Sequence, residues 1–293
     1  MHLLMILTAL SLAWWLRSHN SSHPQGSWDR RWQHVMSLFL LPPLLLTMTA
    51  ISVVYMGAEE VPLLWQWQGR FSYLLASGFL GLAGIILLKQ VSQSWQIQRR
   101  IRTCPQLKLL GVSSRVLDNP IPFSALIGLW QPQLIVTQGL LHTLDNEHLK
   151  AVFKHEQGHS YYQDPFWFFW LGWVRAYTAW LPQTEVLWQE LLLLREMRAD
   201  FWAAQQVDPL LLAESLLQVA SNVSVLSDDC CTAFSCTVGR DRLQERIDAL
   251  LSPDLCLQQS SLWSWNWLLP ILPLLVVPFH SCTHLTNQAL LKG

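Results

Sequence analysis

Two histidines and a glutamate lie close together in the segment "LKAVFKHEQGHSYYQD", residues 149–164. His155 and His159 are four residues apart, so on a helix they project from one face and can bind the same ion. Glu156 is next to His155 and can reach a water molecule on that ion. This HExxH pattern predicts a zinc site, in which the metal lowers the pKa of the water and Glu156 acts as general base.

A second pair of residues supplies candidates for the third ligand, because a catalytic zinc ion has three protein ligands and one open position. Glu196 and Asp200, in "LLREMRADFWAAQ", are also four residues apart and share a helix face. One carboxylate can complete the metal shell, and the other can accept the remaining N–H of a ligand histidine. A charged helix face held by ion pairs explains the same carboxylates without a metal.

Together these segments resemble the membrane gluzincins, and within them the antirepressor peptidases of the beta-lactam and methicillin sensor-transducer type. HtpX and the CAAX prenyl protease are more distantly similar. The resemblance covers about residues 105–251 and the arrangement of apolar segments. It implies that His155, His159 and Glu196 hold Zn²⁺ and that Glu156 is the general base.

The resemblance also extends to residues around this core. Asp200 matches the aspartate that follows the third ligand, and Arg246 in "DRLQERIDALL" matches a supporting arginine, although a solvated helix face explains Arg246 equally well. The segment at 120–141 is similar to an edge-strand region to which a substrate backbone could add as a further strand. Candidates for stabilising the oxyanion are Tyr161, Tyr162 and Arg240, among which neither spacing nor resemblance selects.

The composition is that of a membrane protein. The chain has 293 residues, of which 51% are hydrophobic and only 13% are charged, against about 25% charged in soluble domains. Its formal charge of -1 argues against direct nucleic-acid binding, which needs a basic excess on one surface. Six cysteines without a CxxC pair indicate neither a zinc ribbon nor a disulfide framework.

The fold class that we expect is a mostly α-helical membrane protein with an α+β zincin-like domain inserted between the third and fourth of about four transmembrane helices. The predicted spans are 3–16, 35–58, 71–88 and 262–279. The predicted domains are a transmembrane region at 1–89, a metallopeptidase domain at 90–261, and a last helix with a short tail at 262–293.

Within the inserted domain, strands are predicted around 107–116 and 132–138 from their β-branched content. Helices are predicted at 143–162, with Asp145 as N-cap, and at about 184–205 and 210–220. The aromatic segment 165–182 contains an arginine, so we expect a helix lying in the membrane interface, although a full crossing remains open.

Basic residues set the expected orientation, because Lys and Arg remain on the cytoplasmic side. Those after the third span are Lys89, Arg99, Arg100 and Arg102. They predict a multi-pass protein of the bacterial cytoplasmic membrane, with the N-terminus outside and the active site facing the cytosol.

These patterns lead to an expected function, regulated cleavage of a protein substrate, for which the resemblance favours a winged-helix transcriptional repressor. The alternatives are quality control of membrane proteins and a non-catalytic transmembrane receptor on the same fold. Because only 280–293 follow the last span, where the family's sensors carry a penicillin-binding domain, we expect no beta-lactam sensing by that route. The sequence indicates no oligomeric state.

Two further clusters are hypotheses only. His280, Cys282 and His284 alternate in the tail and are ligands that soft metals favour, although an ordinary exposed tail explains them too. The segment "DDCCTAFSC", residues 228–236, is a second cysteine cluster with the same standing.

Overall fold

The computed structural model describes residues 2–19, 28–57, 66–224 and 240–252. The predicted fourth span at 262–279, the tail with its histidines and cysteine, and the cysteine cluster at 228–236 lie outside the described residues. The described chain forms two compact units, which are treated separately below.

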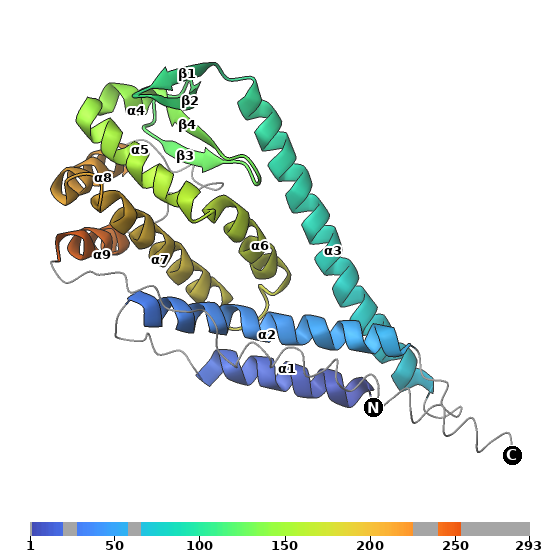
Figure 1. Cartoon of the computed structure of the whole chain (residues 1–293). Coiled ribbons are helices and arrows are strands. Elements are labelled where there is room, and N and C mark those ends of the chain that lie inside the picture. Colours follow the sequence, from blue (N-terminus) through green and yellow to red (C-terminus); the bar gives the residue numbers. More distant parts are fainter. Residues whose placement is uncertain (1, 20–27, 58–65, 225–239, 253–293) are drawn as a thin grey trace, which may run out of the picture. The chain divides into compact units, whose positions relative to one another are not determined.

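The first unit consists of the described residues of Met1–Lys89 and Trp173–Gln189. Its helices are α1 (His2–His19), α2 (Trp28–Met56), the first part of α3 (Gln66–Arg102), the end of α6 (Asp164–Tyr177) and the start of α7 (Thr184–Ala204) (Figure 1). Small residues of α1 pack against leucines of α2, as Ala9 and Ala13 lie in one buried cluster with Leu45 and Leu46.

Among the described residues, two helices are long and apolar enough to cross a membrane, where the sequence predicts three in this part of the chain and four in all. These are α2 and residues Gly69–Arg102 of α3. The first predicted span forms α1 but is not among them. Its apolar run of 14 residues, 3–16, reaches only about 21 Å as a helix, which is short for a hydrocarbon core of about 30 Å.

A buried arginine joins three elements of the first unit. Pro43 lies inside α2 and has no N–H to offer the carbonyl of Phe39 one turn earlier. Nη2 of Arg17 donates to that carbonyl oxygen at 3.1 Å, while its Nη1 lies 3.3 Å from both the Pro182 carbonyl and Thr184 Oγ1. The guanidinium therefore satisfies backbone groups that a proline and a turn leave open.

The second unit, made of the described residues of Gln90–Gly172 and Glu190–Gln258, contains a four-stranded mixed sheet. The strands are β1 (Gln106–Leu109), β2 (Val112–Leu117), β3 (Ser124–Ile127) and β4 (Gln133–Thr137), in the order β1-β2-β4-β3. β1 and β3 run antiparallel to their neighbours, and β2 runs parallel to β4. The short edge strand β3 lies in the region for which the resemblance implied one.

Helices α4 (Gln138–Thr143) and α5 (Asn146–Tyr161) pack against this sheet. Helix α8 (Pro209–Ser224) packs on α5, and α9 (Arg240–Leu251) packs on α8. Asp145 is the N-cap of α5, as predicted, because its side chain accepts from the backbone N–H groups of Glu147 and His148. Val136 of β4 and Phe153 of α5 belong to one buried cluster, which fixes α5 against the sheet.

Candidate metal centre

The metal centre depends on a close approach of α5 and α7 in the second unit. A Cβ added to Gly158 would lie only 3.2 Å from both the Cα and the carbonyl oxygen of Ala199. Glycine at 158 therefore allows the two helix backbones to touch. The contact brings the face of α5 that carries His155 and His159 against the face of α7 that carries Glu196.

The three side chains converge on one point. His155 Nε2 lies 3.1 Å from His159 Nε2 and 3.3 Å from Glu196 Oε2, and His159 Nε2 lies 3.6 Å from Glu196 Oε1. All three side chains are buried or nearly so. Ligand atoms that bind one tetrahedral zinc ion at about 2.0–2.1 Å are separated by about 3.3–3.4 Å. The observed spacings can accommodate a metal ion of that size.

Two carboxylates orient the imidazole rings from behind. Asp164 Oδ2 accepts a hydrogen bond from His159 Nδ1 at 2.7 Å. Asp200 Oδ1 lies 2.8 Å from His155 Nδ1, a contact close enough for an ion pair but without the geometry of a hydrogen bond. Each carboxylate favours a proton on the Nδ1 atom beside it, which leaves an Nε2 lone pair directed at the other ring. Two such lone pairs repel each other unless a cation, either a proton or a metal ion, lies between them, so the donor set fits a metal.

Arginines neutralise the carboxylates of this centre. Arg246 donates from Nε and Nη2 to both oxygens of Asp200, at 2.7 and 2.9 Å. Arg198 donates to Asp164, and Arg195 donates to Oε1 of Glu196 at 2.6 and 3.0 Å. The predicted supports Asp200 and Arg246 thus lie together, directly behind His155.

Asp164 and the arginines at 195 and 198 are residues that the sequence analysis missed. Asp164 lies five positions after His159 and is only 2% exposed. The chain reaches it through Gln163, whose φ of 54° ends α5 and turns the backbone back toward the histidine. The left-handed backbone conformation of Gln163 cannot be recognised from the sequence. The only available indication of Asp164 was therefore that an acidic residue follows shortly after the motif.

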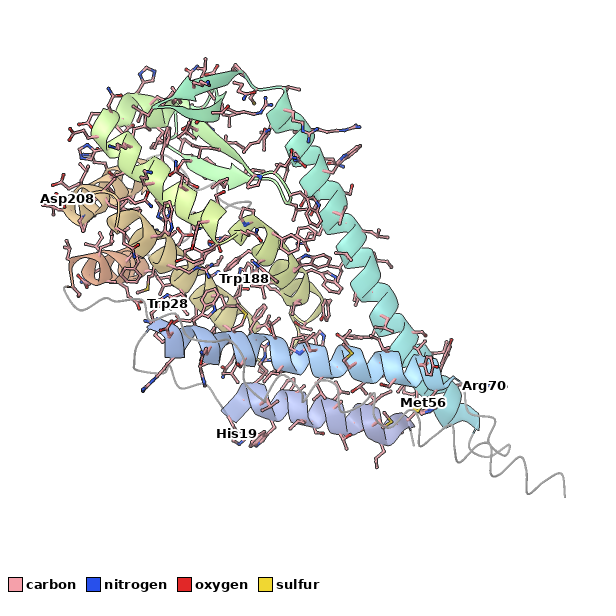
Figure 2. All side chains as sticks on the ribbon, viewed as in Figure 1. His19, Trp28, Met56, Arg70, Trp188 and Asp208 are labelled. Carbon is pink, nitrogen blue, oxygen red and sulfur yellow. The ribbon has the colours of Figure 1, made fainter. Side chains whose placement is uncertain are left out.

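The three oxyanion candidates have different surroundings. Tyr162 lies under the guanidinium of Arg198, whose Cζ is 4.1 Å from the ring centre, whereas Tyr161 is largely exposed. Arg240 begins α9, but its side chain is outside the described part of the chain. Figure 2 draws the described side chains, with Asp208 marking the turn between α7 and α8 in this unit.

Glu156 is buried on α5 and faces the sheet. Its Oε1 accepts a hydrogen bond from Ser124 Oγ on β3 at 2.7 Å. It also lines a cavity of about 300 Å³ between α5 and the sheet, together with Leu126 of β3 and Gln157 of α5. The contact with Ser124 links the proposed base to the edge strand, a link that the sequence analysis did not identify.

The electrostatics of the centre favour a cation at the imidazoles. Burial alone would lower the pKa of both histidines, but the charges of Asp200 and Glu196 outweigh it and raise the pKa of His155 to about 10. Glu196 and Asp164 also raise the pKa of His159. Burial would raise the pKa of Glu196, yet Arg195 and the two histidines hold that pKa well below its ordinary value. The same field that attracts a proton attracts a metal ion.

Comparison with protein families, with characterised proteins and with solved structures finds no match to this chain. What the structure supports is a buried His-His-Glu triad that fits the spacing of HExxH with a later glutamate, together with two long apolar helices.

Replacing Asp164 with Asn should weaken binding of zinc about 10–100-fold, because the ligand His159 loses the anion that fixes its tautomer. Metal affinity measured by competition with a fluorescent chelator checks this. Asp248→Asn, on the exposed side of α9, is the matched control and should leave the affinity unchanged. An unchanged affinity in Asp164→Asn would remove the orienting role.

Zinc binding should release protons and strengthen with rising pH. Because the pKa of His155 is about 10 in the metal-free protein, this ring is protonated at neutral pH and must lose its proton to bind zinc. Glu196, with its lowered pKa, is already ionised and releases none. The affinity should rise about tenfold per pH unit for each proton released between about pH 6 and 8. Calorimetry in buffers of different ionisation enthalpy counts the protons, and a pH-independent affinity would contradict the assignment.

Proposed function

We propose that this protein is a membrane-embedded zinc endopeptidase of the gluzincin type. The observation that carries the proposal is the buried cluster of His155, His159 and Glu196; Glu156, next to His155 on α5, contacts Ser124 of the edge strand β3. Within the described residues the group contains three ligands. Three protein ligands leave the fourth position of a tetrahedral zinc open for water, which hydrolysis requires. A structural zinc site, in contrast, is closed by four protein ligands.

We assign Glu156, the residue next to His155 on α5, the role of general base. A zinc ion held by the triad would supply a Lewis acid and lower the pKa of the attacking water. Glu156 would take a proton from the attacking water and later deliver it to the leaving amine. Ser124 Oγ donates to Oε1 of Glu156, which holds the carboxylate in one orientation and leaves Oε2 for the proton transfer.

The edge strand β3 offers a docking site for a peptide backbone. One edge of β3 pairs with β4, and its other edge carries no strand among the described residues. An extended substrate that adds there would satisfy backbone hydrogen bonds and pass close to Glu156, because Ser124 belongs to β3. The cavity beside Glu156 has room for a side chain next to the scissile bond.

The proposed setting is the bacterial cytoplasmic membrane, with the active site on the cytosolic side. Support comes from the two apolar helices and from the basic residues at the end of α3. As substrate we propose a winged-helix transcriptional repressor that is cleaved in response to a signal. A quality-control protease would use the same chemistry on damaged membrane proteins, and its deletion would lead to their accumulation.

Glu156→Gln tests catalysis directly. The variant should retain zinc, because residue 156 is not a ligand, and should lose at least about 100-fold of its cleavage rate, because general base catalysis contributes about 10²–10⁴-fold. Purified wild type and variant in nanodiscs, with zinc quantified, are incubated with the candidate repressor and with an unfolded protein. If neither zinc-loaded protein cuts either substrate, the non-catalytic receptor becomes the better explanation.

Ser124→Ala should lower kcat about 10-fold while KM and zinc content stay unchanged, since the hydroxyl orients the base without binding metal. Ser124→Thr, which keeps the hydroxyl, should recover part of the rate. Ser252→Ala, at an exposed serine just after α9 whose hydroxyl donates to the Asp248 carbonyl, is the control. A loss confined to KM would place Ser124 in substrate binding instead.

A further inference from the structure

Four aromatic side chains gather on one part of the second unit, and we call them the aromatic patch: Trp130, Phe166, Trp167 and Trp170. Trp130 lies in the loop joining β3 and β4, and the other three lie on α6. The ring of Phe166 is 5.3 Å from that of Trp130, 5.4 Å from that of Trp167 and 6.5 Å from that of Trp170. The four rings therefore form one continuous surface.

This surface is exposed to an unusual degree. Trp130 is 82% exposed and Trp167 is 56% exposed, and Trp170 is also exposed. A contiguous exposed apolar surface normally marks a binding site for a protein or a membrane. Tryptophan in particular concentrates at the membrane–water boundary, where an apolar ring and a polar N–H are both accommodated.

The end of the apolar run in α3 indicates how deep in a membrane the aromatic patch would lie. That run covers 71–88, and the next residues are Lys89 and Gln90. Nε2 of Gln90 donates to the backbone carbonyl of Phe169 at 2.8 Å. Phe169 on α6 therefore lies at the level at which α3 becomes polar. The α6 members of the patch are within three residues of Phe169, which is about 4.5 Å along the helix.

We propose that the aromatic patch is a membrane-anchoring surface, which inserts into the headgroup region of a phospholipid bilayer. Continuity with α3 favours lipid over a protein partner, because Gln90, just after the apolar run of this membrane-length helix, is hydrogen-bonded to Phe169 next to the patch. The proposal rests on the proposed insertion of α3 into a membrane. It narrows the predicted interfacial segment 165–182 to its first part and adds Trp130 from a different element.

The last residues of α6 belong to the first unit and have different neighbours. Nε1 of Trp173 donates to the Ala83 carbonyl at 2.8 Å, and the ring of Tyr177 packs edge-on against that of Phe79. Both partners lie in the apolar run of α3. This end of α6 therefore packs on an apolar helix rather than lying flat in the headgroups.

The patch places the site close to the lipid. Asp164, which orients His159, is five residues before Phe169, or about 7.5 Å along α6. Trp130 lies in the loop that follows β3, and in Figure 1 this loop lies at the end of the sheet near α6. Roughly three extended residues, which span about 10 Å, separate the end of β3 from Trp130. A peptide that adds to β3 would therefore run within this distance of the headgroups.

Photo-crosslinking to lipid tests the patch. p-Benzoylphenylalanine replaces Trp130, Leu82 or Leu107 in three separate full-length proteins in nanodiscs made with an alkyne-tagged phospholipid, and lipid adducts are quantified after illumination. Leu82 is exposed within the apolar run of α3 and is the positive control. Leu107 is exposed on β1 and is the negative control, because the 12 residues of α3 after Gln90 carry the chain about 18 Å further.

Position 130 should give an adduct yield comparable to that of position 82 and several-fold above that of position 107, with zinc content unchanged in all three proteins. An adduct at 82 with none at 130 would overturn the patch while leaving membrane insertion intact. The absence of adducts at both 82 and 130 would overturn membrane insertion and the patch with it. Equal yields at 130 and 107 would also overturn the proposal, because the contact would then be non-specific.

Discussion

The contact between Gly158 and Ala199 is the constraint on which the metal centre depends. The site takes two ligands from α5 and one from α7, so its dimensions follow from the separation of these helices. A methyl group at position 158 would lie 3.2 Å from the Ala199 backbone, so the two helices would have to move apart by a few tenths of an ångström. A shift of even a few tenths of an ångström would then alter the distances between imidazole and carboxylate. Gly158, inside the HExxH motif, therefore helps to set the geometry of the centre.

The parts that could be predicted from the sequence are local. The spacing of His155 and His159 fixes a shared face once a helix forms, and Asp145 is recognisable as the residue that starts that helix. Glu196 and Asp200 share a face by the same periodicity. Periodicity is a property of a single element, so it survives any arrangement of the others. The resemblance added the pairing of these two helices, which spacing alone leaves open.

The parts that could not be predicted depend on tertiary contacts or on unusual backbone conformations. Ser124 meets Glu156 only because β3 lies beside α5, and "SALI" is too short to be recognised as a strand by its composition. Asp164 reaches His159 through a left-handed glutamine. The first predicted span failed for a different reason. Counting apolar residues found a helix but overestimated its reach, and α1 instead uses Arg17 to hold the neighbouring elements.

Charge balance explains why so polar a cluster can be buried. The carboxylates of Glu156, Asp164, Glu196 and Asp200 face three guanidinium groups, those of Arg195, Arg198 and Arg246. One negative charge is left over, and a buried unpaired charge is costly. In the metal-free protein a proton on His155 offsets that charge, which is why its pKa is so high. A divalent ion held by the triad would replace this proton and would bind to Nε2 atoms that the carboxylates behind them orient. The arginines therefore support the site, because Arg195 helps to hold the pKa of Glu196, and Arg246 that of Asp200, below the ordinary value against the effect of burial.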